Sequence, residues 1–514
     1  RDVAVTGVQT CALPISHVGT RGEGCHLELK SSATICSSVH EASSLFLSLL
    51  IARHRRVSPM IRLSKKPLEG IRVIDSSYVF AGPYATGLLG DLGAEVIKVE
   101  GPTRPDFTRG GAFSGLLPEN EPKDDPWNRM SAYNLVNRGK KSLVLDLTRK
   151  EGRDVFVDLL KKSDVLVENF TPRVMRGWGL DYPNLKKLNP GIIMVSNTGY
   201  GRGGPYSAYP AQATTQEATH GLAAVTGYAG GEPSKAGQSY VDFLAAWTIC
   251  MAAMIGLRYR RRFGSGLWAD IGMYQLGCYN VSEFVMDNIA NGAKGERIGN
   301  RHRQYAPQGT YRCAGKDAWC ALSVRDDDEW RALAGVIGKP ELASDSRYAT
   351  EAARRTNHDA IDALITQWTS NLSKIEAMER LQQAGVPAGA VLDGRDLHFN
   401  PQLKERGLIE KVAFPPERDM GPARPLIGRP WNFSKIPLSI KGPAPAYGQH
   451  NAEVLRDVLG YDEARIAALR AEKLVVDGKP VKPREFPMMS MDKRVEIGRL
   501  AYWEPDYREK LGIL

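Results

Sequence analysis

Several common site patterns are missing from this chain of 514 residues, and each absence excludes a class of site. None of the seven cysteines forms a CxxC pair or a cluster with histidine, so neither a zinc site nor a disulfide framework is predicted. No GxGxxG opens a helix directly after a strand, and no GxxxxGKS/T occurs, which argues against a nucleotide cofactor. The longest uncharged apolar run, 243–257, has 15 residues and is short for a membrane span.

Charge of one sign is not in large excess either. The chain has 68 Lys and Arg against 58 Asp and Glu, and this net charge of +10 favours anionic ligands. The basic residues are scattered, and no zinc finger, helix-turn-helix or aromatic-rich RNA-binding motif is present. We therefore expect neither a nucleic-acid partner nor a membrane partner.

The first 59 residues carry no periodicity that continues into the rest of the chain. The opening RDVAVTGVQTCALPIS resembles a translated sequencing adapter. The apolar run 45–52 precedes its arginines, which is the reverse of a secretory signal. We interpret residues 1–59 as a non-native or disordered leader, and expect the natural chain to begin at Met60 and to stay in the cytoplasm.

From residue 68 onward, β-branched runs alternate with helical patterns. Five runs predict strands: IRVID (71–75), AEVIKVE (94–100), SLVLDL (142–147), DVLVENF (164–170) and GIIMVSNTG (191–199). This alternation predicts an α/β fold with a mainly parallel sheet covered on both faces. Ligands of such sheets bind at the carboxyl ends of the strands, where Gly-, Asn- and Pro-containing loops follow here.

Asp242 is the most informative single residue. It lies between a glycine-containing loop (227–240) and the apolar run 243–257, at or near the start of a buried helix. An aspartate there is by default an N-cap that accepts backbone N–H groups. The same geometry keeps a carboxylate ionised, and an apolar wall leaves it poorly hydrated and able to attack an acyl carbon. The residues alone leave both interpretations open.

Other charged residues are weaker candidates. Four basic residues border the strand-end loops and either meet phosphates or form a solvated face: Lys140, Lys141, Arg173 and Arg176. Glu217 and Glu232 lie close to the Asp242 loop in sequence, where they either assist the chemistry or serve packing and the surface.

Five segments together resemble the family III CoA-transferases, the carnitine and formyl-CoA transferase group known as the CaiB/BaiF family. They are LEGIRVIDSS…AGPYATGLLGDLGAEVIKVEGP (68–102), NRGKKSLVLDLTRKEGR (137–153), DVLVENFTPRVMRGWGLDYPNLKKLNPGIIMVSNTGYGRGGP (164–205), DFLAAW…GLRYRRRFGSGLWADI (242–271) and GQHNAEVLRDVLGYDEARIAAL (448–469). The similarity spans about residues 65–472, in the family's order and spacing.

The resemblance implies a large Rossmann-like domain, a smaller inserted α+β domain and an interlocked dimer. The implied segments are 60–275 and 447–473 for the large domain, 301–400 for the small domain, 276–300 and 401–446 for linkers, and 474–514 for a C-terminal extension. The partner is expected to be a second copy of the chain, or a related subunit in a heteromer.

The resemblance also implies which residues act. Asp242 matches the family's nucleophilic aspartate, which takes CoA from an acyl-CoA and passes it to a carboxylic acid through an aspartyl anhydride and an aspartyl-CoA thioester. No metal or permanently bound cofactor is implied, because the CoA thioester is the substrate. The implied CoA-binding residues are Val79, Phe80, Leu145, Thr148, Asn169, Phe170, Thr171, Arg173, Arg176, Pro210 and Ala213.

Some positions depart from the family pattern. Gly101, Thr148 and Gly177 stand where family members carry basic residues, so the phosphate contacts are expected from Arg149, Arg173 or Arg176. Phe80 replaces a polar residue near the acyl group of formyl-CoA transferases, which favours a larger or more apolar acyl group.

Two alternative functions remain. The related α-methylacyl-CoA racemases place a His-Asp pair where this chain has Gln212 and Ala213, and an amide cannot shuttle protons. A non-catalytic subunit of a heteromeric transferase is the second alternative.

Overall fold

The structure is a computed structural model that describes residues 66–110, 117–237, 240–483 and 488–513. The predicted leader, residues 1–59, and the predicted start at Met60 lie outside this part of the chain. The described residues from Leu68 onward belong to one compact unit.

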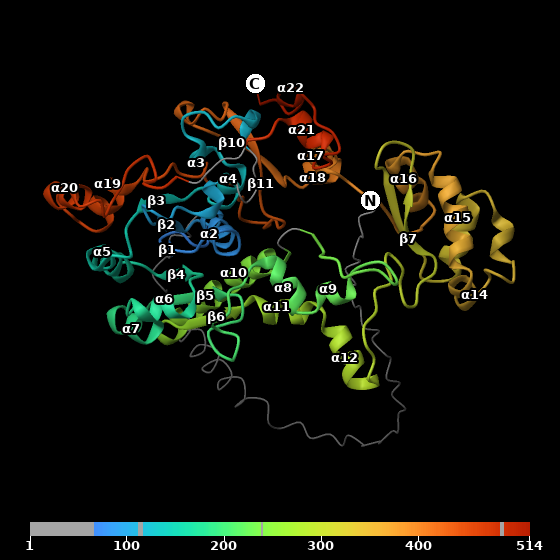
Figure 1. The fold of residues 1–514 in the computed structure, drawn as a ribbon, viewed down its shortest axis with the longest axis horizontal. Coiled ribbons are helices and arrows are strands. Elements are labelled where there is room, and N and C mark those ends of the chain that lie inside the picture. Colours follow the sequence, from blue (N-terminus) through green and yellow to red (C-terminus); the bar gives the residue numbers. More distant parts are fainter. Residues whose placement is uncertain (1–65, 111–116, 238–239, 484–487, 514) are drawn as a thin grey trace, which may run out of the picture. The chain divides into compact units, whose positions relative to one another are not determined.

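A six-stranded parallel sheet forms the centre of the fold, in the order β3-β2-β1-β4-β5-β6 (Figure 1). The strands are β1 (Arg72–Asp75), β2 (Glu95–Glu100), β3 (Lys141–Val144), β4 (Val165–Glu168), β5 (Ile193–Thr198) and β6 (Trp268–Gly272). Every neighbouring pair is parallel. The predicted α/β fold with a mainly parallel sheet is therefore confirmed, although the sequence analysis missed β6.

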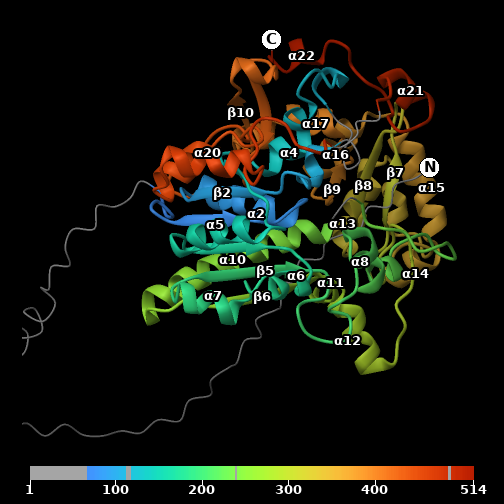
Figure 2. The same cartoon turned by 60° about the vertical axis from the view of Figure 1, so that its left-hand side comes forward.

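Helices cover both faces of this sheet. Alternate strand residues point to opposite faces, and apolar residues on both faces pack against helices. Ile74 packs into one apolar cluster and its neighbour Val73 into the other. The first cluster contains α5 (Lys150–Lys161), α6 (Pro172–Gly177), α7 (Tyr182–Leu188), the π-helical turn η5 (Val454–Val458) and α20 (Glu463–Ala471). The second contains α2 (Ala81–Asp91), α4 (Ser131–Val136) and α10 (Tyr240–Phe263), which lies beside β5 (Figure 2).

A separate three-stranded antiparallel sheet lies within the predicted small domain. Its strands are β7 (Gln308–Arg312), β8 (Trp319–Ser323) and β9 (Ala388–Ala390). The helices of this region are α13 (Asp327–Val336), η3 (Pro340–Ala343), α14 (Glu351–Thr356), α15 (His358–Thr369), α16 (Lys374–Gln383) and α17 (Gly394–Phe399). Buried apolar side chains of β7, β8, α13, η3, α15 and α16 form a core of their own, which includes Trp330.

The remaining elements connect these regions. Before β3 and β6 come η1 (Phe107–Arg109), η2 (Pro118–Asn120), α3 (Pro126–Arg129), α8 (Ala213–Thr219) and α9 (Leu222–Val225). The segments predicted as linkers carry α11 (Met273–Asn280), α12 (Ser282–Asn291), α18 (Pro401–Glu405), η4 (Pro416–Arg418) and the antiparallel hairpin of β10 (Ile409–Ala413) and β11 (Ala423–Ile427). The last elements are α19 (Asn451–Glu453), α21 (Met491–Glu496) and α22 (Tyr507–Lys510).

The C-terminal extension is held by specific polar contacts. The side chain of Asn120 donates to the carbonyl of Met489 at 3.0 Å and accepts from Arg494 at 3.0 Å. Arg395 forms an ion pair with Glu504 at 2.9 Å. The extension also lines a cavity of about 1140 Å³. The described residues of the extension are therefore bonded to the elements around them.

Among the described residues, one helix, α10, is long and apolar enough to cross a membrane by length and composition alone. A third of its most apolar window is buried. The helix packs against α2 and β5 and ends in three arginines. These contacts are those of a helix that packs one of its sides against the parallel sheet.

Candidate functional site

The chain reverses direction across the sheet between β1 and β4. From β1 it builds β2 and β3 on one side, and then returns to build β4, β5 and β6 on the other. At such a switch point the loops after the two central strands diverge and leave a crevice, where open α/β sheets bind their ligands. Here these loops begin at Ser76 after β1 and at Asn169 after β4.

The loop after β1 makes a tight turn held by the loop after β4. Oδ1 of Asn169 accepts the backbone N–H of Tyr78 at 2.9 Å, and Nδ2 of Asn169 donates to the Tyr78 carbonyl at 2.8 Å. The rings of Phe170 and Tyr78 lie 5.9 Å apart. Val79 follows with a φ of +75°, a left-handed conformation that a β-branched residue rarely adopts. The structure thus brings Val79, Asn169 and Phe170 together, and the turn between them is strained.

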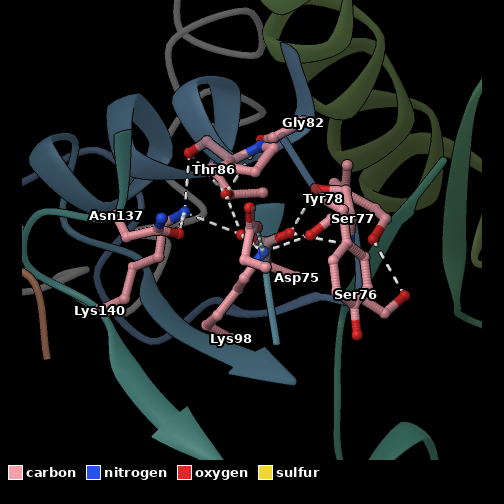
Figure 3. Close-up of polar contacts among 12 residues, drawn as sticks. Asp75, Ser76, Ser77, Tyr78, Gly82, Thr86, Lys98, Asn137 and Lys140 are labelled. Atoms are coloured by element: carbon pink, nitrogen blue, oxygen red, sulfur yellow. Dashed lines mark hydrogen bonds and ion pairs between the residues drawn. The ribbon is translucent and has the colours of Figure 1, made fainter. Parts of the chain in front are cut away.

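A network of buried charges lies beneath this turn (Figure 3). Oδ2 of Asp75, at the end of β1, accepts hydrogen bonds from Lys140 at 2.8 Å and from Thr86 at 2.8 Å. Oδ1 of Asp75 accepts the backbone N–H of Ser77 at 3.0 Å. Lys98, on β2, lies 4.0 Å from Asp75. The carboxylate of Asp75 therefore ties β1, α2 and the start of the turn together.

The charges of this network set one another's pKa values. Burial alone raises the pKa of Asp75, but the Lys140 and Lys98 ammonium groups outweigh it and lower the pKa to about 2. Burial lowers the pKa of Lys140 to about 8, against the attraction of Asp75 and with the help of the Lys98 charge. Burial also disfavours charge on Lys98, yet Asp106 and Asp75 raise its pKa above the ordinary value. Of the two lysines, Lys98 is therefore the one that holds its proton more tightly.

For Lys140, the expectation that it either meets phosphates or belongs to a solvated basic face is corrected by this network. The Lys140 side chain is fully buried against Asp75, because β3 begins directly after it and points it inward. Lys141 is occupied by ion pairs with Glu95 at 2.6 Å and Glu453 at 2.7 Å.

Asp242 lies in the first turn of α10 and is partly buried. The next side chain, Phe243, places this helix start beside the strained turn. Its ring centroid lies 6.3 Å from that of Phe80 and 5.8 Å from that of Tyr84. The predicted position of Asp242 at the start of an apolar helix is confirmed, and its neighbour contacts the loop that follows β1.

The loop that leads to Asp242 has a buried anchor on α8. Oε2 of Glu217 accepts the backbone N–H of Ala236 at 3.0 Å, and Glu217 is buried. Glu232, the other carboxylate considered from the sequence, is exposed. Glu217 thus anchors the loop from outside, whereas Glu232 belongs to the loop and faces solvent.

The other predicted CoA-binding residues lie in the segments that follow β3, β4 and β5, at the carboxyl ends of these strands. Leu145 is buried in the core after β3, and Thr148 is exposed with its hydroxyl 2.6 Å from Asp146. Thr171 is exposed directly before α6, and Arg173 and Arg176 are exposed on that helix. Pro210 is exposed and Ala213, the first residue of α8, is half-buried. Arg149, proposed for a phosphate contact, pairs with Glu472 at 3.2 Å.

Sequence reasoning missed the residues that support the turn. They are Asp75, Lys98 and Asp106, all fully buried. A signal was present in the strands, because RVID places Asp75, and EVIKVE places Lys98 and Glu100, among buried apolar residues. Lys, Glu, Arg and Asp are almost never fully buried unless paired, so each predicts a buried partner.

The described ranges contain no group of three or more His, Cys, Asp or Glu side chains arranged to hold a metal ion. Their cysteines, Cys250, Cys278, Cys313 and Cys320, are free thiols.

Known proteins resemble the chain over most of its length. A succinyl-CoA–D-citramalate CoA-transferase of Chloroflexus aurantiacus is 32% identical over 410 residues, which is 80% of this chain and 98% of that protein. The beta subunit of a succinyl-CoA–L-malate CoA-transferase of the same organism is 32% identical over 413 residues, again 80% of this chain and 98% of that protein.

Solved structures agree with these sequence relatives. A CAIB/BAIF family protein from Brucella suis superposes with a TM-score of 0.68 at 30% identity, covering 77% of this chain and 100% of that chain. The model of CoA-transferase family III matches residues 68–451. The resemblance seen in the sequence is therefore confirmed: the chain belongs to CoA-transferase family III.

Proposed function

We propose that the chain moves CoA from an acyl-CoA to a carboxylic acid, with Asp242 as the nucleophile. The observation that carries the proposal is the place of Asp242 in the first turn of α10, next to Phe243, which packs on the loop after β1 at the switch point of the sheet. The N-terminal end of a helix favours an ionised carboxylate. Phe243, beside Asp242, lies against the rings of Phe80 and Tyr84, so we expect bound substrate to complete a poorly hydrated surface that favours nucleophilic attack.

The reaction begins when an oxygen of Asp242 attacks the thioester carbon of the donor. The C–S bond breaks, leaving a mixed anhydride and CoA thiolate. The thiolate then attacks the aspartyl carbonyl, which releases the donor acid and leaves CoA bound to Asp242 as a thioester.

The second half of the reaction reverses these bonds with a new acid. The acceptor carboxylate attacks the aspartyl thioester, giving a second anhydride and freeing the thiolate. Attack of the thiolate on the acceptor's acyl carbon then restores the Asp242 carboxylate and forms the new acyl-CoA. Each step exchanges one activated acyl group for another, so the reaction needs no external source of energy. The protein's part is to position the reacting groups and to exclude water.

We assign the CoA moiety to the loops at the carboxyl ends of β1 and β4, which contain Val79, Phe80 and Asn169. Arg173 and Arg176 are exposed on α6, directly after the Asn169 loop, where their charges suit the phosphates of CoA. Succinyl-CoA is the donor we test first, because it appears in the names of two relatives. The apolar Phe80 favours an acyl partner that is larger or more apolar than oxalate.

The active form is proposed to be an interlocked dimer. Large apolar side chains on α10, α11 and α12 are exposed in the single chain, with Met251 at 57%, Tyr279 at 83% and Ile289 at 71%. Exposed apolar patches of this kind mark protein interfaces. A second copy of the chain is the simplest partner, and a related subunit is the alternative, since one relative is named as a beta subunit.

Free cysteines agree with a location in the reducing cytoplasm.

The proposal is tested by replacing Asp242 with Ala and with Asn. CoA exchange from succinyl-CoA into a panel of carboxylic acids should fall by about 10³-fold or more, as for other nucleophiles. Asp154→Asn is the matched control, because Asp154 is exposed on α5 and forms an ion pair with Lys150 on the same helix. Exchange that survived at the wild-type rate in D242A would remove Asp242 from the mechanism.

Trapping gives an independent readout. Hydroxylamine should modify Asp242 only after acyl-CoA is added, and mass spectrometry locates the modified residue. Exchange of the α-hydrogen of the acyl-CoA for deuterium, without transfer of CoA, would instead favour a racemase.

A further inference from the structure

The turn after β1 is held in a conformation that its sequence does not favour. Val79 has a φ of +75°, a region usual for glycine and rare for a β-branched residue. Such a conformation persists only where the surroundings impose it, and residues of this kind cluster at ligand-binding sites. The side chains that hold Val79 in this conformation are therefore candidates for a role in ligand binding.

Asp106 and Lys98 hold this turn at both ends. Oδ1 of Asp106 accepts the backbone N–H of Val79 at 3.2 Å. Its other oxygen, Oδ2, accepts from Nζ of Lys98 at 2.8 Å. The same Lys98 ammonium group donates to the carbonyl of Ser77. One carboxylate and one ammonium group thus fix a backbone donor and a backbone acceptor only two residues apart.

The support itself is rigid. Asp106 and Lys98 are both fully buried. The backbone N–H of Asp106 donates to Glu100 at 3.0 Å, and Glu100 forms an ion pair with Arg109 at 2.9 Å. Buried charges are costly to a protein unless they are paired. Beyond their ion pair, Asp106 also accepts hydrogen bonds from Thr108, and both Asp106 and Lys98 bond to the backbone of the turn. A glycine at position 79 would adopt the same turn without such a network.

We propose that Asp106 is a positioning residue for CoA. Together with Lys98 it holds Val79 in the left-handed conformation and so fixes the surface against which the acyl-CoA lies. The inference rests on the proposed function, which assigns this turn to CoA, and Asp106, which is fully buried, acts on CoA only through the turn.

The first test removes the acceptor of the Val79 N–H. In D106A, the dissociation constant for coenzyme A, measured by isothermal titration calorimetry, should rise by about tenfold or more, because the turn must be ordered on binding. The KM for acyl-CoA should rise with it, and kcat at saturating acyl-CoA should change little. The matched control is Thr108→Val. The Thr108 hydroxyl bonds to the same Asp106 oxygen at 2.8 Å but makes no contact with the turn, so T108V should bind CoA as the wild type does.

The second test separates positioning from folding. Val79→Gly in the D106A background should recover much of the lost affinity, since glycine needs no external hold at this φ. A general defect in folding would not be repaired by this change. If D106A folds poorly, K98M/D106A, which removes both buried charges, and its V79G derivative make the same comparison.

The outcomes are distinct. A wild-type protein that binds no coenzyme A would remove the proposed function, and this inference with it. A wild type that binds CoA, together with a folded D106A that binds equally well, would overturn the inference alone. Failure of V79G to lower the dissociation constant of D106A would also overturn it.

Discussion

Nζ of Lys140 lies 2.8 Å from Oδ2 of Asp75, and neither side chain is exposed to solvent. In Asp75→Asn, Lys98 and Lys140 stay buried while one of the carboxylates that balance their positive charges is lost. We therefore expect a loss of about 3 kcal/mol in the free energy of unfolding. D75N/K140M should be more stable than D75N, because the buried ammonium group without a carboxylate is gone. Urea unfolding of the two single variants and the double variant measures this coupling. Simple additivity of the two single effects would show that the pair is not coupled.

The pH dependence of stability follows from the same lysine. Burial lowers the pKa of Lys140 to about 8 from 10.5. Between these values the unfolded chain binds more protons than the folded chain, so stability rises with pH. The stability of the wild type relative to K140M should therefore increase from about pH 8 to about pH 10, by up to about 1.4 kcal/mol per pH unit. Unfolding curves of both proteins across this range give the difference, and a difference that stayed constant or fell would contradict the assigned direction.

Acyl specificity is expected to depend on Phe80. Its ring lies 6.3 Å from that of Phe243, the neighbour of Asp242. Phe80→Gln should shift the ratio of kcat/KM values toward small polar acyl groups over apolar ones by about tenfold, the range for a change in one pocket contact. Phe263→Gln is the control, because Phe263 is exposed at the other end of α10. Equal ratios in wild type and F80Q would place the acyl group elsewhere.

The C-terminal extension should stabilise the region around β9 and α17. Truncation after residue 483 removes the Arg395–Glu504 ion pair and the hydrogen bond from Tyr502 to Asp393 at 3.1 Å. It also removes Ile513, which is 2% exposed. We expect the midpoint of thermal unfolding to fall by about 1 °C for each kcal/mol lost, because the unfolding entropy of a chain of this length is large. Hydrogen exchange should quicken around residues 388–399 and stay unchanged in β1 and β4. Uniform quickening would indicate a global effect instead.

The sequence predicted the parallel sheet well because its strands are buried on both faces. Runs such as DVLVENF have no polar face to confuse the pattern, and five predicted strands match β1 to β5. It missed β6, whose WADIG alternates in exposure at the edge of the sheet, and the hairpin of β10 and β11, whose strands are only partly buried. Short, half-exposed strands leave little periodicity to detect.

For the site, a local pattern placed Asp242 at a helix start, and the structure confirms that position. The support of the turn could not be predicted, because it is not local. Lys140 resembles a surface lysine in the run RGKKS, and only the strand order β3-β2-β1, with β3 beginning directly after Lys140, shows that it reaches Asp75. The left-handed Val79 gives no signal either, since nothing in the residue type favours that φ.

The strand order also decides when the site can exist during synthesis. The turn at Val79 is bonded to Asn169, which leaves the ribosome about 90 residues later, and Phe243 reaches Phe80 later still. A nascent chain that has completed β3 therefore carries the buried charges of Asp75, Lys98 and Lys140 but only one wall of the crevice. Substrate cannot assist the early stages of folding, and any gain in stability from CoA arrives only after β4 has docked.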